Sequence, residues 1–210
     1  MILIKAEEIM ESAEQDVKLR LLRAAKKLFA QQGFDRTTIR QISDEAGANV
    51  ALISYHFGGK EKIFEALFEH FLPNELIRAS VDRPFPPVEG IIHIIEQVMQ
   101  YRFREPEMML ILQQEISLGT PRTSVIRKYM FPIWGKLRNL LEEGRRIGVF
   151  RFRSLDNALL SVLGSILFHR NTDYFQPLLE HTPQSAQELV DDVTEYVLGG
   201  LHYAGESVKK

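Results

Sequence analysis

Glycines at three points divide residues 17–72 into a series of helical pieces. Gly33 follows an amphipathic stretch in which Leu21, Ala25 and Leu28 recur at helical spacing, at the place where a C-terminal cap is expected. Gly47 comes only about two helical turns after Thr38, and the pair Gly58-Gly59 ends the next piece. These stops predict a long helix, two short helices and the start of a further long helix.

Helix-start signals agree with the glycine stops. Either Thr37 or Thr38 can accept a backbone N–H as an N-cap, and Thr38 with Gln41 fits a capping box. Asn49 is expected to cap the second short helix, which runs over residues 50–56. Two short helices joined by a tight turn at Gly47 after a longer helix make a helix-turn-helix.

The same segment carries an uneven share of the charge. Residues 17–62 contain nine Lys and Arg against four Asp and Glu, a net charge of +5, whereas the whole chain of 210 residues has a net charge of −2. A basic segment in an otherwise acidic chain suggests a module that binds a polyanion. A merely solvated helix face is the alternative for such a run taken alone.

Several classes of protein are disfavoured by what the sequence lacks. It contains no cysteine, so disulfides and thiolate metal sites are excluded. Residues 1–16 hold five acidic side chains and do not resemble a secretory signal, and no apolar run approaches a membrane span, so a cytoplasmic protein is expected. The six histidines show no metal-ligand spacing, and no phosphate-binding glycine loop or nucleophile elbow occurs. We therefore expect neither an enzyme nor a metal or cofactor.

The rest of the chain also indicates helices. Further helices are expected near residues 89–104, 107–118, 122–147, 155–171 and 185–203. The proline-rich stretch 81–88 is the best candidate for a break, and no convincing strand alternation occurs. The fold class predicted is all-α: an N-terminal three-helix helix-turn-helix domain over residues 1–62, with its core at 17–62, and a larger helical bundle over 63–210.

The second short helix has the composition that a DNA-reading helix needs. Ile53 and Phe57, four residues apart, can dock it on its neighbours. Its other sides offer hydroxyl, amide and imidazole groups for phosphates and base edges, from Asn49, Ser54, Tyr55 and His56. Lys60 lies at the start of the next helix as a further phosphate contact.

Residues 17–72 resemble the DNA-binding domain of the TetR family of bacterial transcriptional regulators. The resemblance is carried by AAKKLFAQQGFDRTTIRQISDEAGANVALISYHFGGKEKIFEAL, over about a quarter of the chain. It implies a homodimer whose two recognition helices read a palindromic double-stranded DNA operator, usually to repress transcription. Beyond residue 80 only the helical layout is similar to the family.

By position, the resemblance implies a set of DNA contacts. Phosphates would be bound by Thr38, Tyr55, His56 and Lys60. Base edges would lie near Arg40, Asn49, Val50, Ala51, Leu52 and Ser54. Helical spacing alone would place Val50 in the core with Ile53 and Phe57, whereas the family register turns it toward DNA; we expect the latter, with thymine methyl contacts. Each of His56, Tyr55 and Lys60 has an alternative as an ordinary surface or supporting residue.

The resemblance also implies that the larger domain holds a ligand pocket and the dimer interface. The helices around 156–171 and 186–205 are candidates for that interface, through Ser161, Gly164 and Ser165 on the first and Tyr196 on the second. The alternative is that both helices are internal core. Aromatic and methionine side chains could line an apolar effector pocket or be plain core: Phe103, Met108, Met109, Tyr129, Phe131, Trp134, Phe168, Tyr174 and Phe175.

The function expected is a ligand-responsive repressor. Two alternatives stay open. One is a DNA-binding dimer of the same fold that marks chromosomal sites or binds a protein partner, without control by a small molecule. The other is a helical protein that binds or converts a small molecule and has lost its DNA role.

Overall fold

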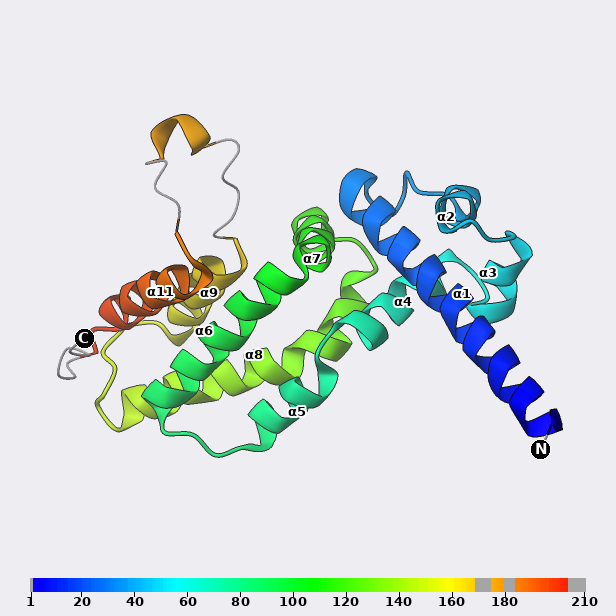
Figure 1. Ribbon diagram of the computed structural model, residues 1–210. Helices are drawn as coiled ribbons and strands as arrows, with labels where there is room; N and C mark the ends of the chain where they lie inside the picture. The colour runs from blue at the N-terminus through cyan, green and yellow to red at the C-terminus, as the bar shows by residue number, and fades with distance from the viewer. Residues whose placement is uncertain (1, 169–174, 180–183, 204–210) are drawn as a thin grey trace. The chain divides into compact units, whose positions relative to one another are not determined.

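The protein is helical throughout the part of the chain that the structure describes. This computed structural model describes the backbone of residues 2–168, 175–179 and 184–203, and the side chains of residues 14–168, 175, 177–179 and 184–203. Within these ranges there is no strand. The helices are α1 (Ile2–Gln32), α2 (Ile39–Ala46), α3 (Ala51–His56), α4 (Lys60–Phe71), α5 (Asn74–Asp82), α6 (Pro87–Arg104), α7 (Pro106–Leu118), α8 (Thr123–Arg146), α9 (Leu155–Leu167), the 3-10 turn η1 (Gln176–Leu178) and α11 (Ala186–Gly200) (Figure 1).

These elements confirm the all-α prediction and correct it in places. The helix α5 was not predicted, and it occupies most of the interval between Leu72 and the proline-rich break. α1 begins at Ile2, well before the expected start near residue 17. α9 ends at Leu167, and the last residues of the helix expected over 155–171 lie outside the described residues.

The chain forms two compact units, of which the first comprises Met1–Leu72 and Glu107–Ile126. Its core is aromatic: the ring of Phe64 lies 6.2 Å from that of Phe29, 5.6 Å from that of Phe34 and 5.1 Å from that of Phe68. α4 contributes Ile63, Phe64, Leu67 and Phe68 to this core, all fully buried. Burying large aromatic surface contributes much of the stability of so small a unit.

α7 belongs to the first unit although it is far along the chain. Lys26 Nζ of α1 lies 3.5 Å from Glu107 Oε2, and Gln114 Nε2 donates to the carbonyl of Ala30 at 3.0 Å. Met108 and Met109 of α7 are buried. In packing terms, the chain therefore parts after Leu72 and not at the proline-rich stretch. The functional division between residues 62 and 63 stays a prediction.

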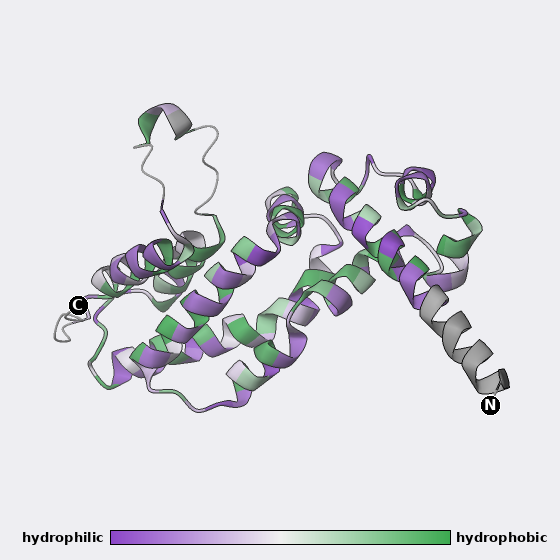
Figure 2. Ribbon diagram, in the orientation of Figure 1, coloured by the Kyte–Doolittle hydropathy of each residue, from purple (hydrophilic) through white to green (hydrophobic). Residues whose placement is uncertain are grey.

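The second unit comprises Pro73–Pro106 and Arg127–Lys210. α6 packs against both α9 and α11, and these helices carry apolar and polar residues on different sides (Figure 2). Arg102 of α6 is buried and donates to the carbonyls of Ile166 at 3.2 Å and Leu167 at 3.4 Å. The last carbonyls of a helix have no hydrogen-bond partners within that helix, and at the end of α9 the Arg102 guanidinium supplies them.

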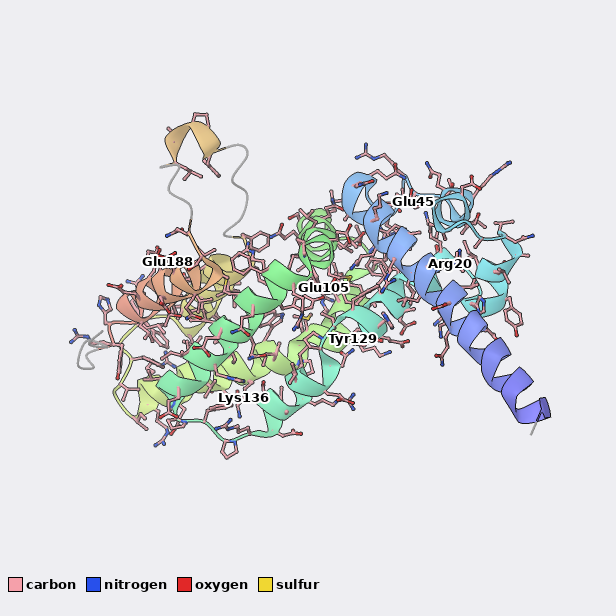
Figure 3. All side chains as sticks on the ribbon, viewed as in Figure 1. Arg20, Glu45, Glu105, Tyr129, Lys136 and Glu188 are labelled. Carbon is pink, nitrogen blue, oxygen red and sulfur yellow. The ribbon has the colours of Figure 1, made fainter. Side chains whose placement is uncertain are left out.

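Two side chains fix the ends of helices in this unit. Lys136 of α8 donates to the carbonyls of Val81 at 3.1 Å and Arg83 at 2.8 Å, and so holds the end of α5 (Figure 3). Phe150 follows the turn at Gly148 and is buried against Gly144 of α8. The segment around Gly148 therefore has a structural role. No helix among the described residues combines the length and the apolar character needed to cross a bilayer.

Candidate nucleic-acid interface

The predicted turn between α2 and α3 has the expected local geometry. Thr38 caps α2, its side chain accepting from the Gln41 amide at 3.2 Å while Gln41 Oε1 accepts from the Thr38 amide at 2.9 Å. Gly47 has φ of 59°, the left-handed conformation that glycine adopts without strain. Asn49 Oδ1 accepts from the amide of Ala51, the first residue of α3, at 2.9 Å. Thr38 is confirmed as a capping residue. The prediction for Asn49 is corrected: Val50 is the N-cap of α3 and makes no side-chain cap bond, and Asn49 binds the Ala51 amide from one residue earlier.

The two short helices each bury one side. α3 is docked by Ile53, which is fully buried, while Leu52 and Phe57 are half-buried. α2 is docked by Ile42 and Ala46, but Ile39, which was expected to face inward, is 37% exposed. Ile39 is the first residue of α2, and the buried residues of this helix, Ile42, Ser43 and Ala46, all lie further along it.

The opposite side of α3 is exposed. Val50, Ala51, Ser54 and Tyr55 share it, since residues four apart lie one above the other on a helix. Val50 is 42% exposed and Tyr55 is 71% exposed. Val50 is therefore not a core residue, and the register expected from the family resemblance is confirmed for its exposure. The side presents two apolar groups and two hydroxyls.

His56 does not share this outward position. Its side chain is only 6% exposed, and Nδ1 lies 3.7 Å from Glu14 Oε1 of α1. Its ring packs edge-on against that of Tyr55 at 4.9 Å. The sequence-based expectation of an outward-facing imidazole is corrected, because α1 extends far enough toward its N-terminus to cover the end of α3.

Lys60 has a different set of partners from those expected. Its ammonium group donates to the carbonyl of Phe34 at 2.9 Å and to that of Thr37 at 2.7 Å, and it lies 4.2 Å from the centre of the Phe34 ring. The N-terminus of a helix carries a partial positive charge, which disfavours a lysine there. The two carbonyls stabilise the Lys60 ammonium at the start of α4, so a bound phosphate is not needed to account for it. An ammonium has three donors, so one remains for a phosphate oxygen.

Basic side chains also lie on α1 and α2. Arg40 is exposed on the first turn of α2, beside the exposed cap Thr38. On α1, Arg20 Nη1 donates to the carbonyl of Ala46 at 3.2 Å, and Lys27 pairs with Glu45 at 2.6 Å (Figure 3). The segment from α1 to α3, called the DNA-reading head below, therefore combines the exposed side of α3, the N-terminus of α2 and several cations. These features together suit binding to the phosphates of a duplex.

Comparison with known proteins agrees with this geometry. Residues 21–67 match the family model described as bacterial regulatory proteins, tetR family. The transcriptional repressor NicS of Pseudomonas putida is 31% identical over 136 residues, which cover 62% of this chain and 64% of NicS.

Solved structures extend the similarity to nearly the whole chain. The hemolysin II transcriptional regulator HlyIIR superposes with a TM-score of 0.70 at 25% identity, covering 90% of this chain and 98% of that one. The ketosteroid transcriptional regulator KstR2 of Mycobacterium tuberculosis gives a TM-score of 0.67 at 25% identity, covering 88% and 94%. Residues 21–67 therefore form a DNA-binding domain of the TetR family, and the chain shares the fold of TetR-family transcriptional regulators.

TetR-family proteins are regulators and not enzymes, in agreement with the expectation from the sequence. The chain spans somewhat less than two thirds of NicS, 64% of its length. The residues that match the family model, 21–67, all lie in the first unit.

The late helices of this chain leave an open groove in the second unit. Residues of α9 and α11 line most of a hollow of about 400 Å³, among them Ser161, Ser165 and Tyr196. Leu160 is 65% exposed and Tyr196 is 75% exposed. The sequence placed Tyr196 on the same side of α11 as Val193 and Val197, but those two valines are buried and Tyr196 is not.

The aromatic and methionine set is divided between the two units. Met108 and Met109 lie in the core of the first unit, whereas Phe103 and Phe131 are 48% and 59% exposed in the second. Tyr174 lies outside the described residues. Met108 and Met109 agree with the alternative that members of this set are plain core, and an effector pocket lined by the others stays a prediction.

Sequence reasoning missed the residues that hold the turn between α1 and α2. Phe34 and Asp35 of this turn contact Arg122, which directly precedes α8. Because 87 positions separate Asp35 from Arg122, no local pattern could have paired them.

Proposed function

We propose that this chain is a ligand-responsive repressor that binds a palindromic DNA operator as a homodimer. The single observation that supports this most is the exposed side of α3, with Val50, Ala51, Ser54 and Tyr55 pointing outward from a helix docked by Ile53. In this proposal α3 lies in the major groove, where a short helix fits and base edges are distinguishable. Such a protein works in the cytoplasm, beside the bacterial chromosome.

The chemistry of this side indicates how bases would be read. Val50 and Ala51 offer methyl groups that suit thymine, and Ser54 offers a hydroxyl that can donate or accept. Arg40, on α2, reaches toward a guanine or a phosphate. Thr38 and Tyr55 would bind phosphates from either end of the head, with the third Lys60 proton as a further donor.

Two copies would associate through α9 and α11. Gly164 and Gly199 leave open space where a side chain would stand, since an added Cβ at either would meet nothing within 4 Å. Leu160 and Tyr196 stand exposed beside them. In a two-fold contact the same surface of both copies meets, so the exposed apolar side chains of one copy can pack into the space beside the glycines of the other.

Control by a small ligand would act on the spacing of the two reading heads. A ligand changes this equilibrium only if it binds one spacing better than the other. HlyIIR and KstR2 are named as a hemolysin II regulator and a ketosteroid regulator, so the same fold serves unrelated regulatory targets.

Selection of bound fragments from genomic and random-sequence DNA tests the function. The full chain is expected to enrich a palindromic site, with an affinity that falls steeply as salt rises because phosphate neutralisation releases counterions. Enrichment of no duplex, or binding independent of salt, would refute the proposal.

Variants then assign the contacts on the enriched site. Arg40→Ala and Asn49→Ala are expected to change which bases are preferred, by a discrimination of about 1–3 kcal/mol per lost base contact. If either variant weakens all sequences equally, that residue contacts the backbone and does not read bases.

A further inference from the structure

The turn between α1 and α2 is anchored by one ring. Phe34 is 5% exposed, and its ring lies 5.1 Å from that of Phe29 and 5.6 Å from that of Phe64. Three residues further on, Thr37 is fully buried and its Oγ1 donates to the carbonyl of Gly33 at 2.8 Å. The next residue is Thr38, the cap of α2. The position of this cap therefore depends on how the turn is held.

Two cations from other parts of the first unit lie over the same ring. Lys60 Nζ is 4.2 Å from the centre of the Phe34 ring, and the Arg122 guanidinium carbon is 4.0 Å from it. Cations within about 6 Å of a ring centre are attracted to its face. Lys60 also binds the carbonyls at either end of the turn, those of Phe34 and Thr37.

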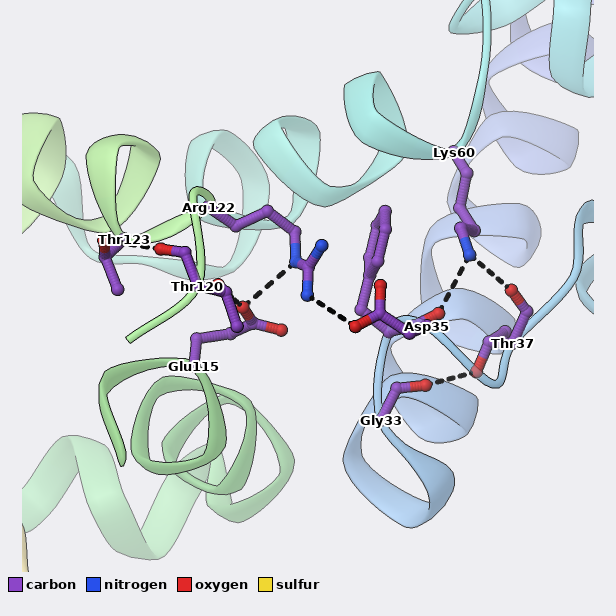
Figure 4. A network of polar contacts seen from close by, with 9 residues as sticks. Gly33, Asp35, Thr37, Lys60, Glu115, Thr120, Arg122 and Thr123 are labelled. Atoms are coloured by element: carbon purple, nitrogen blue, oxygen red, sulfur yellow. Dashed lines mark hydrogen bonds and ion pairs between the residues drawn. The ribbon is translucent and has the colours of Figure 1, made fainter. Parts of the chain in front are cut away.

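Arg122 adds two charge-assisted contacts (Figure 4). Its Nη2 donates to Asp35 Oδ2 in the turn at 3.2 Å, and its Nε donates to Glu115 Oε2 of α7 at 3.0 Å. The Glu115 carboxylate also accepts from Thr120 Oγ1, and its side chain is only 4% exposed. The guanidinium lies over the Phe34 ring and binds two carboxylates, so its orientation is fixed. A lysine could not replace it, because one ammonium group lacks the planar arrangement of donors that reaches both carboxylates.

Arg122 also lies next to the helix that connects the two units along the chain. Arg122 directly precedes α8, and α8 runs from Thr123 in the first unit into the second unit, which begins again at Arg127. Pro132 interrupts the backbone hydrogen bonds of α8 further along, but the turns from Thr123 to Arg127 precede it and can carry a displacement along the helix axis. A movement of α8 would thus reach the α1–α2 turn at Arg122.

We propose that Arg122 is a positioning residue for the DNA-reading head: it holds the α1–α2 turn, and with it the Thr38 cap, and couples that turn to the first residues of α8. This inference rests on the proposed function and specifies its regulation. Because coupling between two sites is reciprocal, DNA binding must in turn affect the α7–α8 junction.

The first test needs no DNA. Amide exchange of the full chain is measured by mass spectrometry for the wild type, Arg122→Ala and the matched control Arg127→Ala, which removes the same charge five residues later. Arg122→Ala is expected to speed exchange over residues 33–38 by about threefold or more, because the turn opens more often. Arg127→Ala should leave that segment unchanged.

The second test uses the selected duplex. In the wild type, the duplex is expected to slow exchange both at residues 33–41 and at residues 115–126. In Arg122→Ala the duplex should still slow exchange at 33–41 but no longer at 115–126, with an affinity lower by about tenfold. Arg122→Lys, which keeps the charge, should fall between the two.

The outcomes separate this inference from the proposed function. Unchanged exchange at residues 33–38 in free Arg122→Ala overturns the coupling whether or not any duplex binds. Equal protection of residues 115–126 by DNA in the wild type and in Arg122→Ala also overturns it. If no duplex binds the wild type, it is the proposed function that fails.

Discussion

Tyr55 carries the largest exposed ring of α3, and its hydroxyl is the group best placed to bind a phosphate. At 71% exposure its hydroxyl exchanges water for the phosphate on binding, so its net contribution should be that of one hydrogen bond to an anionic oxygen. Its neighbour His56 is covered by α1 instead. Two adjacent polar residues therefore have different roles, which their order in the sequence does not reveal.

Tyr55→Phe removes only that hydroxyl. We expect affinity for the selected duplex and for unrelated duplexes to fall together, by about tenfold, since a phosphate contact carries no sequence information. Fluorescence anisotropy with labelled duplexes measures both. Tyr203→Phe in the second unit is the control, and a loss confined to one operator sequence would contradict the phosphate role.

Glu14 places a negative charge beside α3, where the proposed duplex would lie. Glu14→Gln is expected to tighten binding of any duplex by about twofold at low salt, with the gain vanishing at high salt as charges are screened. The same titration on Glu75→Gln, an exposed acid of α5, should show no change. Weaker binding in Glu14→Gln would show that the contact to His56 matters more than the repulsion.

At the scale of elements, glycine has two distinct uses in α8. An added Cβ at Gly144 would overlap the ring of Phe150, whereas one at Gly135 would meet nothing within 4 Å. The first glycine permits close packing of the following turn on the helix. The second lies on an open side and only lowers the helix propensity.

Gly144→Ala is expected to lower the free energy of unfolding by about 1–3 kcal/mol, because the Phe150 ring must leave its place. Gly135→Ala, the same change in the same helix, should instead raise it by about 0.5–1 kcal/mol. Urea unfolding followed by circular dichroism compares the two. Equal effects would mean that Phe150 does not pack as described.

At the scale of the whole molecule, the proposed operator binding needs two copies. Leu160 is 65% exposed on α9, on the surface proposed for self-association. A charge placed there would have to be buried without a partner in the dimer, which is costly. The loss of the second reading head would also remove the gain from binding two half-sites at once.

Leu160→Arg is therefore expected to give a monomer by sedimentation velocity and to weaken binding of the palindrome by about a hundredfold or more. Leu118→Arg is the matched control, since Leu118 is 73% exposed on α7, which belongs to the first unit. A Leu160→Arg protein that sediments as a dimer would show that another surface joins the two copies.

The sequence by itself determined the helix-turn-helix, because its signals are local. The Thr38 capping box, the left-handed turn at Gly47 and the spacing of Ile53 from its neighbours each depend on a few consecutive residues. The helix α5 escaped prediction because its residues show no strong cap, and its start after Pro73 has no side-chain cap in the structure.

Only the tertiary structure decided what surrounds those helices. It turned Val50 outward, covered His56 with α1, and assigned the Lys60 ammonium to two carbonyls. It also brought Arg122 to Asp35 across 87 positions of sequence. The physical reason is the same in each case: hydrogen bonds and ring contacts between distant segments depend on how helices pack, and helical periodicity specifies which side of a helix is apolar but not which partner covers it.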